Sequence, residues 1–224
     1  MLREALDEAR ESEKISRDEH VYLTILNNLA SMLESKGELE QAEAYFQEAL
    51  DTRKKSPKYG LRHPTTLLVS SNLANIYKKQ KKMAEAEKLY REALDAKIET
   101  LGLHHESTLK SMNNLAVFLI EQKTRQAFEG AAVLMGQALE GYVEAMGIQN
   151  PDTITLVRNY GQVLWNLSRH DEALRLVSET LEQVDAVQGK EDRDTRGLAA
   201  TYAALLGAGG QTEKQAEIKV TYSL

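Results

Sequence analysis

Apolar residues recur four positions apart in separate stretches of the chain, with polar residues around them. The spacing occurs at Leu29/Leu33, Leu73/Tyr77, Leu115/Leu119 and Tyr160/Leu164. Positions four apart lie on one face of an α-helix, so each stretch predicts an amphipathic helix with a buried face.

These stretches share a repeated triplet. The triplets are Asn28-Leu29-Ala30, Asn72-Leu73-Ala74, Asn114-Leu115-Ala116, Asn159-Tyr160-Gly161 and a weaker Thr201-Tyr202-Ala203. Their central residues lie 44, 42, 45 and 42 positions apart. Such a period is typical of solenoids, in which stacked repeats bury a continuous core.

A second helix is expected to begin near a small residue in each repeat. These residues are Ala42, Ala86, Ala131 and Ala173, with Ala131 displaced by a three-residue insertion. A small side chain lets two antiparallel helices approach closely. The insertion lies around Thr124–Gly130, where we expect it to lengthen the turn between the two helices. The left-handed position that ends a second helix is predicted at Gly60, Gly102, Gly147 and Gly189.

The composition agrees with a helical protein. The chain of 224 residues has 28 Lys+Arg against 34 Asp+Glu, a formal charge of −6, with 3 Pro and no Cys. The lack of Cys excludes a disulfide scaffold, a thiolate metal site and a cysteine nucleophile. No apolar run approaches the ~18 residues of a membrane span. We therefore predict a soluble, acidic, all-α protein.

Several longer motifs resemble the tetratricopeptide repeat (TPR), in the longer form of kinesin light chains. They are Asn-Asn-Leu-Ala at 27–30 and 113–116, Ala-Glu-Lys-Leu-Tyr-Arg-Glu-Ala-Leu at 86–94, Leu-Gly-x-His-His-Glu-Ser-Thr-Leu at 101–109, and Asn-Pro-Asp-Thr at 150–153. The resemblance implies an all-α, right-handed α-solenoid, a TPR superhelix of antiparallel helix pairs. We expect it to span residues 1–217.

The register divides that array into repeats. We expect the second helix of a partial repeat at 1–14, full repeats at 18–60, 63–102, 105–147 and 150–189, a partial fifth repeat at 191–217, and a non-repeat tail at 218–224. The end of the tail alternates like a short strand. Because the chain opens on a second helix, either residues 1–14 cap the array or the chain is a fragment. We favour the fragment.

No catalytic residue, metal ligand set or cofactor motif is predicted, and we do not expect an enzyme. The chain lacks phosphate-binding glycine loops and a nucleophile elbow. His104 and His105 are adjacent, so their side chains diverge and do not suit one metal. His20, His63 and His105 fall in turns between repeats, where we expect loop hydrogen bonds.

The resemblance implies that the first helices of the repeats line a concave groove. In the family, amides at the Asn28, Asn72, Asn114 and Asn159 positions clamp the backbone of an extended peptide; the alternative is that they fix the stacking of repeats. Further predicted groove residues are Asn75, Lys78, Lys79, Lys110, Asn113, Arg158, Gln162 and Trp165. Trp165 is either a groove anchor or a packing residue between repeats four and five. Repeat five adds a smooth wall of Gly197, Ala200, Ala204 and Gly207.

One stretch is unusually basic. From Arg53 to Lys82 there are nine Lys and Arg residues and no Asp or Glu. The stretch is either a patch that attracts an acidic peptide, or a set of helix-end cations neutralised by acidic neighbours. The overall acidity and the lack of interleaved aromatic residues disfavour nucleic acid.

We therefore expect a protein-interaction adaptor that binds an extended, acidic peptide segment in its groove. The alternative is a structural scaffold subunit of a larger assembly, bound through its convex or end faces. The expected partner is a protein or peptide, and no cofactor is expected. Cytoplasm is the default compartment, with an organelle left open.

Overall fold

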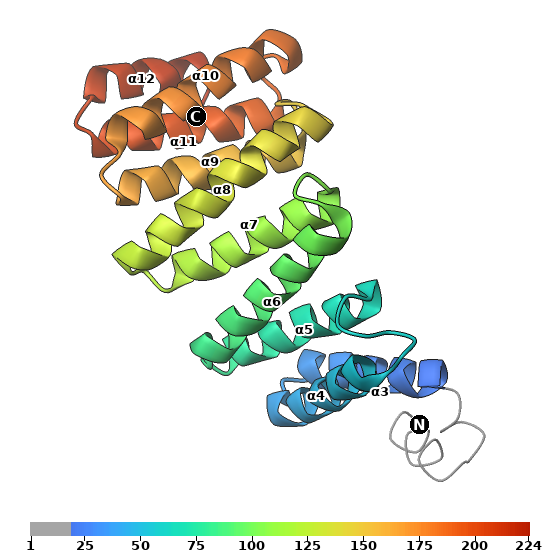
Figure 1. The fold of residues 1–224 in the computed structure, drawn as a ribbon. Coiled ribbons are helices and arrows are strands. Elements are labelled where there is room, and N and C mark those ends of the chain that lie inside the picture. Colours follow the sequence, from blue (N-terminus) through green and yellow to red (C-terminus); the bar gives the residue numbers. More distant parts are fainter. Residues whose placement is uncertain (1–18) are drawn as a thin grey trace. The chain divides into compact units, whose positions relative to one another are not determined.

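A computed structural model of the chain describes residues 19–224, and within that range it contains helices and short turns but no strand. The helix expected at residues 1–14 lies outside the described residues. The described helices are α3 (Glu19–Ser35), α4 (Leu39–Lys55), α5 (Pro64–Lys79), α6 (Met83–Leu101), α7 (Glu106–Glu121), α8 (Arg125–Met146), α9 (Pro151–Asn166), α10 (His170–Gln188), α11 (Arg193–Ala208) and α12 (Thr212–Thr221). The all-α prediction is confirmed (Figure 1).

The chain forms two compact units. Unit 1 ends at Leu101 and unit 2 begins at Gly102. In unit 1, the helix pairs α3–α4 and α5–α6 pack together through contacts of α4 with α5. Leu29, Phe46 and Leu73 are fully buried in their common core. The apolar stripes predicted for repeats one and two therefore form this core.

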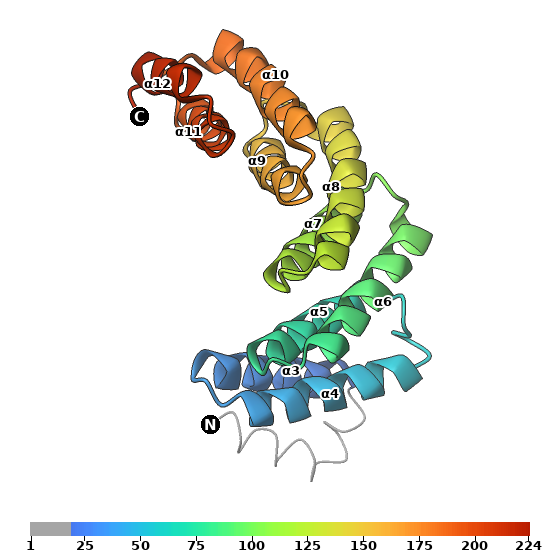
Figure 2. The same ribbon diagram turned by 90° about the vertical axis from the view of Figure 1, so that its left-hand side faces the viewer.

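Unit 2 stacks the pairs α7–α8, α9–α10 and α11–α12. Within it, α7, α9 and α11 lie in one layer, while α8 and α10 lie in the other (Figure 2). Val157, Val177 and Leu198 are fully buried in a core shared by α9, α10 and α11. The first helices of repeats three to five thus share one layer of this unit.

Close approach of the paired helices depends on small residues. Ala42, Ala86, Ala131 and Ala173 are all fully buried at the starts of the second helices. Gly141 has the same role in the C-terminal part of α8. A Cβ atom added there would lie 2.6 Å from Cδ2 of Leu109 on α7. The side chain of Leu109 therefore occupies the space that any larger residue at position 141 needs.

The first helices begin with a recurring N-cap. The Nδ1 atoms of His63 and His105 accept hydrogen bonds from the backbone N–H groups two residues later, at 3.3 and 3.1 Å. Asn150 and Asp192 accept the equivalent bonds at 2.8 Å each. A side-chain acceptor at this position satisfies a backbone donor that lacks a partner within the helix. His63 and His105 therefore lie between helices and form local hydrogen bonds, as predicted, whereas His20 lies inside α3 and not in a turn.

Two columns of residues have a positive φ angle. The predicted column of Gly60, Gly102, Gly147 and Gly189 has φ values of 65°, 88°, 82° and 81°. The second column is the middle residue of the three-residue turn inside each helix pair. It contains Gly37, Lys81, Lys123, Ser168 and Gly210, with φ values of 78°, 62°, 54°, 61° and 76°. No sequence pattern marks this second column, because three of its five members are not glycine.

The insertion in repeat three is accommodated differently from the prediction. The turn from α7 to α8 keeps three residues, at 122–124, as in the other pairs. The extra residues instead extend α8, which has 22 residues against 19 in α6 and in α10. Three residues make nearly one helical turn, so the helix absorbs them. The expectation of a longer turn was wrong.

The strand-like reading of the C-terminal residues was also wrong. Helix α12 runs through Thr221 and packs against α11. The Tyr222 hydroxyl donates a hydrogen bond to Oδ2 of Asp185, at 2.9 Å. Burial and this bond raise the pKa of Tyr222 to about 12. An alternating pattern over so few residues does not distinguish a strand from a helix that places one aromatic residue against α10.

Candidate functional site

All the predicted groove residues lie on first helices. Unit 1 holds those on α3 and α5: Asn28, Asn72, Asn75, Lys78 and Lys79. Unit 2 holds those on α7 and α9: Lys110, Asn113, Asn114, Arg158, Asn159, Gln162 and Trp165. The predicted groove residues therefore form two sets, one in each unit.

In unit 1, the predicted amides differ in their surroundings. Asn28 is exposed and Asn72 is half-buried. Asn75 is exposed, but its Oδ1 atom accepts a hydrogen bond from the Tyr90 hydroxyl at 2.5 Å. Asn75 is thus already engaged by the second helix of its own repeat.

Four of the nine cations of the basic stretch pair with carboxylates from other parts of unit 1. Lys79 pairs with Glu34 on α3 at 2.8 Å. Lys82 pairs with Glu43 on α4 at 2.7 Å, and this bond raises the pKa of Lys82 above its usual value. Charges that are segregated in the sequence are therefore brought together in the fold.

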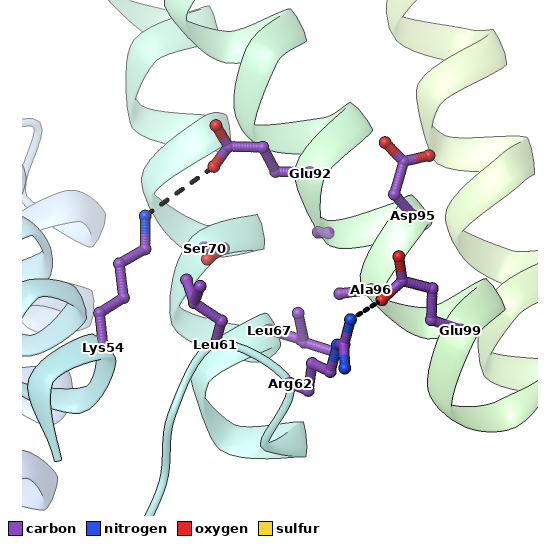
Figure 3. A pocket seen from close by; sticks show the side chains of 10 residues that line it. Lys54, Leu61, Arg62, Leu67, Ser70, Glu92, Asp95, Ala96 and Glu99 are labelled. Carbon is purple, nitrogen blue, oxygen red and sulfur yellow. Dashed lines mark hydrogen bonds and ion pairs between the residues drawn. The ribbon is translucent and has the colours of Figure 1, made fainter. Parts of the chain in front are cut away.

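Two further ion pairs of the stretch cross a cavity of about 560 Å³ in unit 1. Figure 3 shows Lys54 of α4 paired with Glu92 of α6. It also shows Arg62, which precedes α5, paired with Glu99 of α6. The Lys54–Glu92 distance is 3.8 Å. The cations at the edge of this cavity thus have carboxylate partners.

Arg53 is the buried member of the stretch. It is only 5% exposed, and its guanidinium lies 4.8 Å from the centre of the Tyr59 ring. It also donates a hydrogen bond to the Thr65 hydroxyl at 2.6 Å. Carboxylates, or the ring and hydroxyl around Arg53, therefore engage five of the nine cations of the stretch. This favours the second interpretation, in which neighbouring groups neutralise the cations.

In unit 2, the exposed residues of the first helices form one surface, which we call the first-helix face. It consists of Lys110 and Asn114 on α7, Thr155, Arg158 and Gln162 on α9, and Ala200 and Ala204 on α11. Lys110 pairs with Glu106 on its own helix, and this bond lowers the pKa of Glu106. The face also adjoins Asn159, which is half-buried.

Arg158 is an exposed cation that contacts the neighbouring first helix. Its Nε atom donates a hydrogen bond to the Thr201 hydroxyl on α11 at 3.0 Å. Its guanidinium lies flat on α11 at Gly197, where an added Cβ would be 3.1 Å from Nη1. Among residues 19–224, no carboxylate forms an ion pair with Arg158. The guanidinium is therefore held in one orientation while its charge is uncompensated.

Two predicted residues of unit 2 are partly withdrawn from the surface. The Oδ1 atom of Asn113 is buried and has no hydrogen-bond partner among the described residues. Trp165 stacks on His170 with ring centres 4.2 Å apart, and its ring edge would meet a Cβ added at Gly209 at 3.1 Å. Trp165 therefore packs between repeats four and five, as one of the two alternatives proposed.

Thr201 is the residue that sequence reasoning missed. It belongs to the weakest triplet, and repeat five was expected to provide only a smooth wall. The signal available was the combination of a hydroxyl on this wall with an arginine one repeat earlier. The glycine and alanine residues of the wall leave room for the Arg158 side chain to lie against α11.

Neither a metal site nor a membrane helix is found in the described part of the chain. Among residues 19–224, no three His, Asp or Glu side chains are grouped in a way that could hold a metal ion. No helix in this range is both long enough and apolar enough to cross a membrane.

Comparison with known families gives matches to the tetratricopeptide repeat. One profile of this family matches residues 64–129, and a second matches residues 23–56 and 108–152. Together they cover more than half of the chain. No curated protein sequence matches the chain significantly.

Solved structures share the fold at low sequence identity. One is a crystal structure of nearly identical TPR-like repeats from Podosopora anserina, assigned to a kinesin light chain. Its sequence is 18% identical to this chain, and the TM-score is 0.77 over 90% of this chain and 92% of that one. BtubC (BKLC) from P. vanneervenii is 20% identical, with a TM-score of 0.70 over 98% and 88%. YrrB, a TPR protein with an unusual peptide-binding site, is 18% identical, with a TM-score of 0.58 over 99% and 90%.

Proposed function

We propose, because this chain belongs to the tetratricopeptide repeat family, that it is a protein-interaction adaptor which holds an extended, acidic peptide segment. TPR repeats generally mediate protein–protein interactions, and that coarse function applies here. The finer proposal assigns the peptide to the first-helix face of unit 2. In this proposal, the guanidinium of Arg158 binds an acidic side chain of the peptide.

The observation that carries this proposal is the fixed, uncompensated guanidinium of Arg158. Arginine binds carboxylates through two parallel N–H···O bonds, and this geometry requires a defined orientation of the guanidinium plane. Thr201 and the surface of α11 at Gly197 supply that orientation. Because Nε is already bonded to Thr201, the terminal nitrogens remain for a ligand carboxylate.

The rest of the face suits a peptide backbone. Asn114 is exposed and Asn159 is half-buried, and each amide offers both a donor and an acceptor. Ala200 and Ala204 of α11 are exposed and small, so a main chain can approach this helix closely. Asn28 and Asn72 are proposed to act in the same way on the first helices of unit 1.

The predicted groove cations that already have a carboxylate partner do not strengthen the case for acidic ligands. Lys79 would have to exchange its Glu34 partner for a ligand carboxylate, and such an exchange yields little net free energy. Lys110 has the same limitation because of Glu106. The preference for acidic peptides is therefore assigned to Arg158.

The test is a displayed peptide-library selection on the purified chain, followed by titration calorimetry with the enriched peptides. We expect acidic sequences to be enriched. Arg158→Gln should weaken the selected peptide about 10- to 100-fold, as expected for hydrogen bonds to a charged group. Thr201→Val keeps the arginine but removes its support, so a smaller loss is expected.

A matched control removes the same charge elsewhere. Arg175 is exposed on the second helix α10, and Arg175→Gln should leave the affinity within about twofold because a distant exposed charge contributes little. Equal losses for Arg158→Gln and Arg175→Gln would contradict the proposed site. Selection without acidic enrichment would favour the alternative, a scaffold subunit that binds through other faces.

A further inference from the structure

A second surface of unit 2 lies on α8, away from the first-helix face. A hollow of about 610 Å³ opens between residues 125–140 of α8 on one side, and α9 and the turn from α9 to α10 on the other. Its lining includes Arg125 and Val133 on α8, and Leu167 and Arg169 at the turn. We call it the α8 hollow. The extra helical turn of repeat three forms one of its walls.

Part of the floor of the α8 hollow is apolar, and one apolar residue lies at its rim. Leu167 is 8% exposed and the ring of Tyr160 is half-buried, whereas Val133 at the rim is 62% exposed. Gly136 keeps the floor open, because a Cβ atom there would lie 3.3 Å from the Tyr160 hydroxyl. The hollow thus offers room for an aliphatic side chain, with Val133 as an uncovered apolar contact.

The charges around the hollow do not cancel. Arg125 pairs with Glu129 at 3.0 Å, and Arg169 binds Glu172 with its Nε at 2.8 Å. Glu140 also lines the hollow, and no cation pairs with it among residues 19–224. One carboxylate therefore remains uncompensated beside the apolar floor.

Tyr160 supplies a second acceptor for a cation. Its hydroxyl has no hydrogen-bond partner within the described part of the chain. Burial raises the pKa of Tyr160, the carboxylates of Glu172 and Glu140 add to the rise, and Arg169 opposes it. The hydroxyl consequently stays neutral at physiological pH. Its oxygen can then accept a hydrogen bond from an ammonium or guanidinium group.

We infer that the α8 hollow docks a segment of a partner protein that presents a lysine or arginine beside an aliphatic side chain. The aliphatic group fills the floor over Tyr160 and Leu167, and the cation reaches Glu140 at the edge. The charge of this ligand is opposite to that of the peptide assigned to the first-helix face. This inference does not depend on that assignment.

The absence of cysteine makes a site-directed test straightforward. Gln137 is an exposed lining residue, and Gln137→Cys places a single thiol at the rim of the hollow. The variant is equilibrated, under mild reducing conditions, with three disulfide fragments that share one branched alkyl group. The fragments end in an ammonium, a carboxamide or a carboxylate, and intact mass measures the adducts.

We expect the ammonium adduct to exceed the carboxamide adduct about threefold, the effect of one partly exposed charge pair. Adding Glu140→Gln should bring this ratio close to one. Adding Gly136→Leu should lower all three adducts, because the leucine fills the floor. The reference variant Val187→Cys, at an exposed position of α10, should show no preference.

Two results would overturn the inference. The first is an equal yield of the ammonium and carboxamide adducts at position 137. The second is a preference that survives Glu140→Gln or that Val187→Cys reproduces, because it would then reflect the overall acidity of the protein. Retention of the circular dichroism spectrum in each variant shows that the fold is intact.

Discussion

The turns inside the helix pairs provide a direct test of backbone strain. Lys81, Lys123 and Ser168 each occupy the middle of such a turn with a φ angle of 62°, 54° or 61°. A residue with a Cβ atom loses about 1–2 kcal/mol in this left-handed region. Glycine avoids that loss but gives the unfolded chain more freedom, which costs about 0.4–1 kcal/mol. Replacement by glycine should therefore stabilise each turn by about 0.5–1 kcal/mol.

The three turns belong to different repeats, so their effects should add. The triple variant Lys81→Gly/Lys123→Gly/Ser168→Gly should gain about 2 kcal/mol. In a chain of this length, that gain raises the melting temperature by about 4–8 °C. Thermal unfolding followed by circular dichroism at 222 nm measures the shift, and urea unfolding gives the free energy.

Two variants separate backbone strain from loss of the side chain. Lys81→Ala removes the charge but keeps a Cβ atom, so it should leave the stability nearly unchanged. Gly37→Ala is the reverse experiment. Within the described part of the chain, no neighbouring atom lies within 4 Å of a Cβ added at Gly37, so its φ of 78° is what opposes alanine. A loss of stability in Lys81→Gly, or an equal gain in Lys81→Ala, would refute the reasoning.

Three further predictions concern packing and pH. Gly141→Ala should destabilise the protein by about 1–3 kcal/mol in urea unfolding, because its Cβ would overlap the buried Leu109. Tyr222 has a pKa raised to about 12, so its contribution to the free energy of unfolding is complete below the ordinary tyrosine pKa and is lost as the pH rises from 10 to 12. Tyr222→Phe should flatten this loss of stability with pH. An unchanged slope of the free energy of unfolding against pH would contradict the prediction. Backbone N–H groups of Thr195 and Asp194 lower the pKa of Asp192. The contribution of Asp192 to the free energy of unfolding is therefore present above the ordinary carboxyl pKa and is lost as the pH falls through the lowered value. Asp192→Asn should make the loss of stability in acid less steep.

Much of the fold follows from patterns visible in the sequence. Apolar residues four apart, such as Leu29 with Leu33, locate helix faces because the helical period is fixed. The buried alanines and the positive-φ glycines are detectable because each repeats at the same interval. Repetition lets five weak local signals confirm one another.

Other features depended on contacts between residues distant in the sequence. Nothing near Lys79 indicates Glu34, since the two meet only when α3 and α5 are packed together. The insertion near Thr124 is compatible with a longer turn or a longer helix, and packing against the neighbouring helices selects the helix. The support of Arg158 by Thr201 likewise requires α9 and α11 side by side.

The predicted residues therefore lie on the first helices, as the register places them, and their role in binding stays a prediction. The register placed Asn114 and Arg158 on first helices, where their side chains are exposed. It did not distinguish Arg158, which has no carboxylate partner among residues 19–224, from Lys110, which is paired within its own helix. The distinction depends on which group each side chain contacts in the fold, Glu106 for Lys110 and Thr201 for Arg158.

The ion pairs of unit 1 have a consequence for how such an array can change during evolution. Lys79 in repeat two meets Glu34 in repeat one, and position 78 is the counterpart of position 34 one period later. A duplicated copy of repeat two would set its own lysine at the Lys79 position against Lys78 of the original. At this contact, repeats one and two are complementary to each other, whereas two copies of repeat two are not. The array therefore cannot be lengthened by simple duplication of repeat two without placing like charges in contact.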